Sequence, residues 1–449
     1  MPHSSSPSFR VGFVYLYTGL TELLPLHAVY ALLMASHGIS TSELSLLFAL
    51  WTVTTFLFEI PSGAVADRFP RHRVLASAAL AQCTGFVLWT ALPSLGSFAA
   101  GFVLWGLSTA LTSGTLQSLL YDGLAADGRS KEYTRVSSRM ATVQACSIAV
   151  SSLVASPVVL LGGYSAAGWI SAVLTLLAVP TALALGRSRQ DIPAADTPAR
   201  DTPVTDGTDT DASPTKGWLF LLRAGLAEAR DTPQVRSCLL MISVLAGLGV
   251  VDEYLPVLAK EGHAPSAVIP LLLLLPWGAM ALGSFMGWRL AKAGNRALAG
   301  LLLLGGSALA LGALSRHPGG FLGIAVFYWV LRMLQVVMGA RLQHAITGPA
   351  RATVSSVAGL GAQTVSLMIF LGSALGARWV SASMLVALTS IPVFLTATLL
   401  LLRPRHLATA TAQSAQDGPG DVPPVPVSGP TPQADIREDR STPVKESDT

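Results

Sequence analysis

Twelve long apolar runs follow one another along the chain, separated by short polar segments. A helix needs about 20 mostly apolar residues to cross the hydrocarbon core of a bilayer, and only helices and closed barrels satisfy their backbone groups there. Barrel strands are about half as long, so these runs are helices. The pattern predicts an all-α membrane protein with twelve transmembrane helices, at 11–34, 43–66, 74–93, 97–124, 138–161, 165–186, 236–258, 266–288, 297–314, 319–345, 352–376 and 380–402.

Two segments have a composition that favours neither a membrane helix nor a packed core. Residues 187–215 are rich in Asp, Pro and Thr, and residues 403–449 are polar and rich in Pro, so both are predicted to be disordered. Residues 216–232 carry apolar side chains at helical spacing together with Arg223 and Arg230, which predicts an amphipathic helix on the inner membrane surface. The predicted segments are a cytoplasmic N-terminus (1–10), an N-terminal six-helix half (11–186), the linker (187–215), the amphipathic helix (216–232), a C-terminal six-helix half (236–402) and the tail (403–449).

Basic residues are strongly biased towards one side of the predicted helices. Of the 29 Lys and Arg residues, only Lys260, Arg316 and Arg378 fall on the other side, and Arg332 falls within a span. Because basic loops stay in the cytoplasm, both termini and the linker are predicted to be cytoplasmic. The basic residues are spread over many loops, so no nucleic-acid partner is expected. Charged residues make up only 12% of the chain, against about 25% in soluble domains. The chain is rich in Arg, Ala and Gly, which indicates a GC-rich bacterial genome. The expected location is therefore the bacterial inner membrane.

A loop pattern occurs twice, after the second and after the eighth predicted helix. The first copy reads Gly-Ala-Val-Ala-Asp-Arg-Phe-Pro-Arg-His-Arg at 63–73. The second copy is degenerate and reads Gly-Trp-Arg-Leu-Ala-Lys-Ala-Gly-Asn-Arg at 287–296. The repeat indicates two related six-helix halves, and parallel repeats with a binding site near the midplane are a transporter architecture.

Ionisable residues inside the predicted helices point to function, because a charge in the hydrocarbon is costly. Glu22 and Arg332 fall near the middle of the first and tenth helices, and Asp252 and Glu253 fall towards the outer end of the seventh. Because a low-dielectric cavity disfavours a charged carboxylate, Glu22 is predicted to be the main proton-coupling residue, with Asp252 and Glu253 next. A buried structural Glu22–Arg332 pair is the alternative.

Polar and aromatic stripes predict a substrate cavity. Side chains three or four residues apart share one helix face, and a polar face on an apolar span turns to water or protein rather than lipid. The predicted cavity residues are Tyr15, Thr18, Glu22, Trp105, Tyr328, Arg332 and Gln335. For Ser108, Thr112 and Thr115 on the fourth helix, hydrogen bonding between helices is the favoured interpretation. His27 is interpreted as a core histidine, with a proton-carrying role as the alternative.

The second helix ends in Glu59-Ile60-Pro61-Ser62-Gly63, directly before the Asp67-Arg68 loop. In these residues and in its twelve-helix setting, the chain resembles the major facilitator superfamily over about residues 9–405, and within it the bacterial drug-efflux-like branch. The resemblance implies that helices one, four, seven and ten line the cavity. It also implies that Asp67 meets the start of the eleventh helix near Arg351 in the outward-facing state, where a helix N-terminus favours a carboxylate. The implied conformational gate comprises Glu59, Gly63, Asp67, Arg68, Arg71 and Asp122.

The sequence departs from the family pattern in four places. Pro70 stands where the loop usually has Gly, and Ala291 replaces the Asp of the second copy. The fourth helix lacks the Arg that many proton-driven members carry. The fifth ends in Ser156-Pro157 and, four residues later, Gly162-Gly163, instead of the Gly-Pro-x-x-Gly-Gly signature of antiporters. Proton antiport therefore does not follow from the family pattern alone.

These features predict a secondary active transporter that moves a small organic molecule by alternating access. Proton-coupled efflux of lipophilic or cationic compounds is the leading interpretation. Uptake by symport or facilitated diffusion, and a non-transporting membrane sensor on the same scaffold, are the alternatives. The sequence contains no phosphate-binding loop, catalytic triad or metal-ligand spacing, so no enzymatic activity, cofactor or metal is expected, and a proton gradient is the expected driving force. The expected partners are a small-molecule substrate and the lipid bilayer, and the expected state is a monomer.

Overall fold

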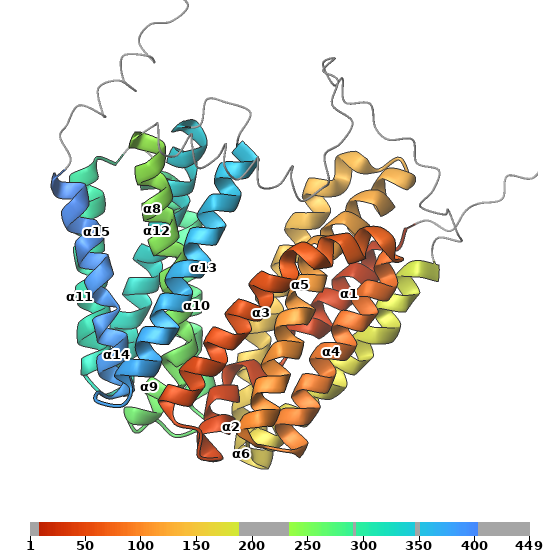
Figure 1. The fold of residues 1–449 in the computed structure, drawn as a ribbon, viewed down its shortest axis with the longest axis horizontal. Helices are drawn as coiled ribbons and strands as arrows, with labels where there is room; N and C mark the ends of the chain where they lie inside the picture. The colour runs from red at the N-terminus through yellow and green to blue at the C-terminus, as the bar shows by residue number, and fades with distance from the viewer. Residues whose placement is uncertain (1–8, 188–232, 291–292, 346–350, 403–449) are drawn as a thin grey trace, which may run out of the picture. The chain divides into compact units, whose positions relative to one another are not determined.

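The structure is a computed structural model that describes residues 9–187, 233–290, 293–345 and 351–402. Over these ranges the chain is helical and contains no strand (Figure 1). The predictions of a disordered linker, an amphipathic helix and a disordered tail fall on 188–232 and 403–449, outside the described residues. The all-α membrane fold is confirmed.

The N-terminal half contains six membrane crossings. The first is discontinuous, and its parts are α1 (Val11–Glu22), the 3-10 helix η1 (Pro25–Ala28) and α2 (Tyr30–Ser36). The others belong to α3 (Thr41–Arg68), α4 (Arg71–Ala91), α5 (Leu95–Ala126) and α6 (Tyr133–Arg187), with η2 (Ser130–Glu132) before α6.

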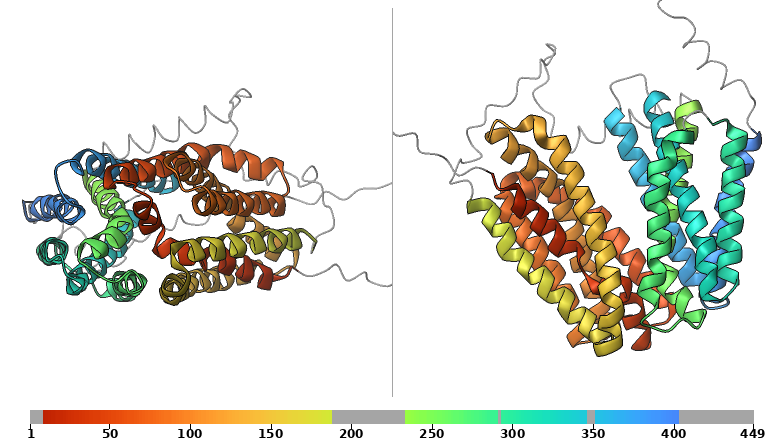
Figure 2. Two further views of the ribbon diagram at one scale, coloured as in Figure 1. Left: turned by 90° about the horizontal axis from the view of Figure 1, so that it is seen from below. Right: turned by 180° about the vertical axis from the view of Figure 1, so that it is seen from behind.

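The element α6 holds two crossings, as the sequence predicts. Its 55 residues would extend about 80 Å as one helix, more than twice the thickness of about 30 Å of the hydrocarbon core. Gly163 interrupts it with φ 66° and ψ −169°, a backbone conformation that is essentially restricted to glycine. The two helices that meet at this glycine are visible in Figure 2, in gold and yellow. Eleven helical stretches of the described chain are long and apolar enough to span a membrane, and the stretch Ser130–Gly186 contributes two of the twelve crossings.

The C-terminal half contains the other six crossings. The seventh crossing is continuous, but a 3-10 segment interrupts its α-helix, and its parts are α8 (Pro233–Gly247), η3 (Leu248–Tyr254) and α9 (Leu255–Glu261). The next three belong to α10 (Ile269–Met286) with η4 (Gly287–Leu290), α11 (Asn295–Leu314), and α12 (Phe321–Ala345) after η5 (Pro318–Gly320). The last two are α13 (Arg351–Gly376) and the pair α14 (Ala382–Leu388) and α15 (Ser390–Leu402).

The two halves are joined at the end where α3 begins and α13 ends. The Ser42 hydroxyl donates to the carbonyl of Ala374 at 2.6 Å, and the Tyr254 hydroxyl donates to Ser45 Oγ at 2.8 Å. The ring of Phe48 contacts both Tyr254 and Phe370. The Ser156 hydroxyl, towards the far end of the fifth crossing, donates to the carbonyl of Ala267 at 2.6 Å. We call this the joined end.

The break at Gly163 generates a prediction about stability. A Cβ at Gly163 would meet no atom within 4 Å, so the cost of Gly163→Ala is purely conformational. We expect a loss of about 1–3 kcal/mol, because alanine cannot adopt this backbone conformation without strain. Thermal unfolding of the purified protein in detergent measures the loss.

The matched control is Gly372→Ala, at a position in the helix α13 where an added Cβ also meets no atom within 4 Å. There alanine should leave stability unchanged or raise it by about 0.5–1 kcal/mol. Equal unfolding temperatures for the two variants would contradict the conformational role of Gly163.

Candidate functional site

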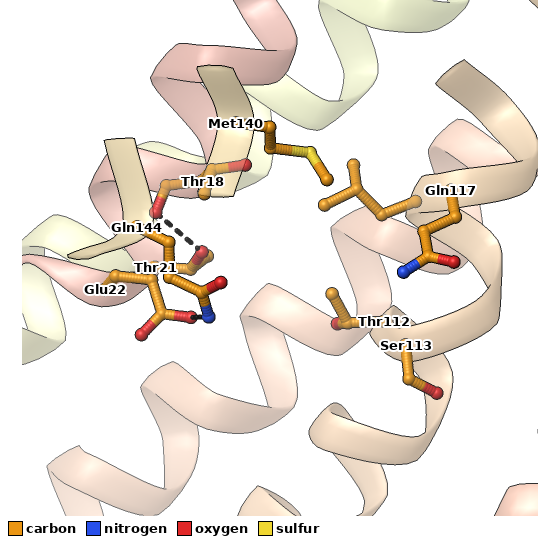
Figure 3. Close-up of a pocket in the computed structure, with 9 residues that line it drawn as sticks. Thr18, Thr21, Glu22, Thr112, Ser113, Gln117, Met140 and Gln144 are labelled. Carbon is orange, nitrogen blue, oxygen red and sulfur yellow. Dashed lines mark hydrogen bonds between the residues drawn. The ribbon is translucent and has the colours of Figure 1, made fainter. Parts of the chain in front are cut away.

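A polar cavity of about 170 Å³ lies inside the N-terminal half, between α1, α5 and the first part of α6 (Figure 3). Its lining residues are Thr18, Thr21, Glu22, Thr112, Ser113, Leu116, Gln117, Met140 and Gln144. Most of these side chains are polar, although they lie within membrane-spanning helices. Polar side chains in a span are costly when they face lipid, so the cavity is suited to water and polar ligand groups.

Glu22 is the one ionisable side chain in this lining. Its carboxylate accepts a hydrogen bond of 2.8 Å from the side-chain amide of Gln144. Within the described chain, no Lys or Arg forms an ion pair with it. The amide holds the carboxylate in place without neutralising it, so the negative charge remains available to a proton or a cation. The alternative Glu22–Arg332 pair is not formed in this conformation.

The span predicted over 11–34 is confirmed as one crossing over Val11–Ser36, but its first α-helix ends at Glu22. The interruption is due to Pro25, which lacks an N–H and stands at the start of η1. The backbone beyond the break is supported from another helix, since Leu26 N–H donates to the Ser171 hydroxyl at 3.0 Å. The break places the carboxylate at a helix end.

The span predicted over 236–258 is confirmed as one crossing over Val235–Glu261, and its α-helix is likewise interrupted, here by a 3-10 segment. Asp252 and Glu253 lie in the 3-10 segment η3, and Pro256 follows at the start of α9. The sequence Glu253-Tyr-Leu-Pro256 matches Glu22-Leu-Leu-Pro25. This Glu-x-Leu-Pro repeat is a second trace of the duplication, and comparison of the two halves in the sequence could have found it.

Two predicted cavity residues support this second break. The amide of Gln335 donates to the carbonyl of Leu245 at 2.8 Å, and the Tyr328 hydroxyl donates to the carbonyl of Gly249 at 3.3 Å. These carbonyls lie where the α-helix changes to a 3-10 helix, so side chains supply hydrogen bonds there. Tyr328 is fully buried, so it is not available to a substrate in this conformation.

Other predicted cavity residues lie in the core of the N-terminal half. Trp105 stacks on His27 and on Trp51, with ring centroids 4.9 Å and 5.3 Å away. Tyr15 packs against a buried apolar cluster, and its hydroxyl is buried without a hydrogen-bond partner. Neither Trp105 nor Tyr15 lines the cavity. Of the seven predicted cavity residues, Thr18 and Glu22 are the two that do.

Most of the cavity wall consists of residues that were not among the predicted cavity residues. Ser113 and Gln117 on α5, and Met140 and Gln144 on α6, form pairs four residues apart that share a helix face. The polar spacing on the fifth predicted helix was the available signal.

The implied gate residues lie at the end of the N-terminal half opposite the joined end. Arg71, at the start of α4, forms an ion pair with Asp122 near the end of α5. Glu59, Gly63, Asp67 and Arg68 are exposed residues of α3, which continues to Arg68 rather than ending at 66. The structure does not describe the side chains of residues 351–353. The contact of Asp67 with the start of the eleventh helix therefore stays a prediction.

Pro70 builds the turn that glycine builds in the family pattern. Only Phe69 and Pro70 separate α3 from α4. The φ of −54° at Pro70 suits the proline ring, and its carbonyl accepts from the Arg73 N–H at 2.8 Å to start α4. The degenerate second copy is held differently, by Arg341 of α12, which donates to the Asn295 side chain at 3.2 Å.

At the joined end, a polar contact connects the two broken crossings. The Tyr30 hydroxyl, from α2, donates to the carboxylate of Glu253 in η3. Asp252 and Glu253 are half-buried here. The predicted proton-coupling residues therefore lie in two different settings, Glu22 in the cavity and the other two at the contact between the halves.

The family model described as Major Facilitator Superfamily matches residues 11–377. The chain belongs to the major facilitator superfamily. Solved structures with the same fold include the nucleoside transporter NupG, with a TM-score of 0.64 and 12% identity over 87% of this chain and 97% of that chain. A bacterial homologue of the human lysosomal transporter Spinster, in an inward-facing and unoccupied conformation, has a TM-score of 0.64 and 13% identity over 92% of this chain and 99% of that chain.

The peptide transporter PepTSo, of the POT family, has a TM-score of 0.60 and 13% identity over 90% of this chain and 98% of that chain. No match was found among the curated proteins. At these identities the likeness to solved structures shows the fold alone. Membership of the superfamily makes this chain a multi-pass membrane transport protein.

The contact between Tyr30 and Glu253 generates a second prediction. Tyr30→Phe removes a hydrogen bond to a carboxylate, which contributes about 1.5–3 kcal/mol in proteins. Because the bond exists only when the joined end is closed, the variant should shift the equilibrium towards the open form of this end by roughly tenfold or more. Spin labels can be placed at Leu92 and Trp379, which are exposed in loops at this end. Opening should appear as a longer distance between the two labels in pulsed electron–electron double resonance.

The control is Tyr328→Phe, which removes a tyrosine hydroxyl bond within the C-terminal half. Its distance distribution should match that of the unmodified chain. Identical distributions for Tyr30→Phe and the unmodified chain would show that the contact does not hold the halves together.

Proposed function

We propose that this superfamily member is a proton-coupled exporter of lipophilic or cationic small molecules in a bacterial inner membrane. The observation that carries the proposal is Glu22, a single carboxylate in a polar cavity whose hydrogen-bond partner is the neutral Gln144. A carboxylate without a fixed cation can bind a proton or a cationic ligand, and it cannot hold both. This competition is the simplest coupling of a proton to an exported cation.

The cavity in the N-terminal half is smaller than a drug-binding site. Its volume of about 170 Å³ compares with roughly 300–1,000 Å³ for sites that enclose drug-sized ligands. We infer that the cavity receives the charged group of a larger substrate, whose apolar part lies between the two halves.

Competition at Glu22 gives export when the proton gradient is directed inwards. If basic loops face the cytoplasm, the joined end is the outer end, and the present conformation faces inwards. In this state the Glu22 carboxylate binds the cation. After the halves reclose at the inner end, a proton from outside displaces the cation. The protonated carboxyl then returns inwards and releases its proton, so each proton that enters drives export.

Reconstituted vesicles test the coupling. Glu22→Gln mimics the protonated carboxyl, so it should abolish transport driven by an imposed pH gradient and weaken binding of a cationic substrate. A cationic fluorescent dye, tetramethylrhodamine methyl ester, serves as the probe, with its flux measured with and without the gradient. Glu22→Asp retains an ionisable group and should keep part of the coupling.

Glu132→Gln is the control, because Glu132 is an exposed carboxylate paired with Arg129 and remote from the cavity lining. It should respond to the gradient like the unmodified chain. A full response of Glu22→Gln to the gradient would show that another carboxylate carries the coupling. A dye that binds the protein but does not cross the membrane would favour the sensor alternative.

The orientation has its own test. Single cysteines at Ser266, in the loop before α10, and at Ser414, in the tail, should have opposite accessibility to an impermeant thiol reagent in intact cells. Ser266→Cys should react and Ser414→Cys should react only after the membrane is opened. Labelling of Ser414→Cys in intact cells would show that the topology is the reverse of the predicted one and that the present conformation faces outwards.

A further inference from the structure

Arg332 is a charged side chain near the middle of α12 whose partners are neutral. Its Nε donates to the Ser284 hydroxyl at 2.9 Å, and its Nη1 donates to the side-chain oxygen of Gln335 at 3.1 Å. The described residues provide it with no ion pair, and the side chain is exposed. Guanidinium has five N–H donors in a planar fork, so Nη2 remains free to bind an acceptor. The arrangement orients a positive charge without neutralising it.

The direction of this side chain follows from its helix. Val330 of α12 packs against Gly305 of α11, which also packs against α14 and α15. Arg332 is two residues further on, about 200° around the helix, so it points away from α11. Its partner Ser284 belongs to α10, and Gln335 reaches on to α8. Arg332 therefore faces the inner helices of the C-terminal half.

Glu22 has the matching position in the N-terminal half. Tyr17 of α1 points to α4, where its hydroxyl donates to the carbonyl of Leu75 at 3.1 Å. Glu22 is five residues on, about 140° around the helix, so it points away from α4. Like Arg332, it is held by a neutral amide, that of Gln144.

The two charges share one region of the molecule because their partners lie on helices that pack across the halves. Gln144 belongs to α6 and Ser284 to α10, and these two helices contact each other, with the Ser156–Ala267 hydrogen bond at the joined end. At 1.5 Å per residue, Gln144 lies about 18 Å and Ser284 about 25 Å along the chain from this bond. The carboxylate and the guanidinium therefore both lie well inside the membrane-spanning part, one on each half, and differ in depth by about one and a half helical turns.

We propose that Arg332 binds the anionic group of the substrate while Glu22 binds its cationic group, so that the transporter selects amphoteric molecules that carry an amine or iminium and a carboxylate. The inference rests on the proposed function and narrows its substrate class. A substrate held by both charges also bridges the two halves, and each charge receives the counter-ion that the protein itself does not supply.

A matched pair of dyes tests this selectivity. Tetramethylrhodamine is a zwitterion with a free carboxylate, and its methyl ester has the same ring system and only the positive charge. Binding of each dye to the purified full-length protein is measured by fluorescence polarisation. We expect the zwitterion to bind about tenfold more tightly than the ester, as a charge-assisted guanidinium–carboxylate contact provides.

Variants assign the preference to Arg332. Arg332→Gln should bring the affinity ratio of the two dyes close to one by weakening only the zwitterion, and Arg332→Lys should retain part of the preference. Arg378→Gln, an exposed arginine in the loop after α13, should keep the full preference. Equal affinities in the unmodified protein, failure to bind the zwitterion, or an equal loss for both dyes in Arg332→Gln would each overturn the proposal.

Two further readouts separate the possible failures. Gradient-driven flux of the methyl ester tests the proposed function alone, so flux of the ester without a preference for the zwitterion rejects only the amphoteric substrate class. A direct structural Glu22–Arg332 pair in the other conformation predicts that the swapped variant Glu22→Arg with Arg332→Glu restores flux of both dyes. The proposal predicts instead that the swap restores neither, because the orienting amides of Gln144 and Gln335 then serve the wrong charges.

Discussion

The lack of water in the bilayer core governs this structure, because each unsatisfied backbone group there costs several kcal/mol. Continuous helices meet this constraint by themselves, and broken helices need side chains from their neighbours. In the first crossing, the backbone hydrogen-bonds to the side chain of Ser171. In the seventh, it hydrogen-bonds to the side chains of Tyr328, Gln335 and Ser366. The Ser366 hydroxyl donates to the carbonyl of Gly247 at 3.4 Å. Polar residues on the neighbouring helices thus make the breaks tolerable, and the breaks in turn place the acidic residues.

The same constraint explains how charges are treated. Glu22 and Arg332 each contact neutral side chains, whereas Arg71 and Asp122 at the helix ends form an ion pair. A permanent pair near the midplane would hold the two halves in one arrangement. Neutral partners fix the geometry of a charge and leave its counter-ion to be supplied from outside, which is what a site for a charged ligand requires.

The fold was predictable from the sequence because a single property, the length of the apolar runs, decides how often the chain crosses the membrane. The kink at Gly163 and the twelve crossings follow from it. The breaks after Glu22 and Gly247 did not follow, because a proline in an apolar run is compatible with a kinked continuous helix. The depth of Glu22 was predictable from its position in the run.

The cavity wall was less predictable, since a polar residue within a span bonds either to a neighbouring helix or to water, and spacing alone does not separate these cases. Tyr328 and Gln335 bond to a neighbouring helix, whereas Gln117 lines the cavity and Gln144 does both. Tyr15 and Trp105 share a helix with cavity residues and yet face the core. Which face of a helix borders the cavity depends on the packing of its neighbours, which one sequence does not contain.

The two copies of Glu-x-Leu-Pro show how a duplicated fold acquires an asymmetric mechanism. Both copies place a glutamate at a helix break, but Glu22 lies in a cavity and Glu253 accepts a bond from Tyr30 of the other half. A carboxylate held by the opposite half is shielded as long as that end is closed, so it cannot exchange a ligand at the same time. Opening the joined end would separate Glu253 from Tyr30 and expose it, with Asp252, to water. On the proposed function, Glu253 in the C-terminal half would respond to which end of the protein is open, and Glu22 in the N-terminal half would respond to what is bound. The duplication would then assign to two separate residues the two events that alternating access must connect.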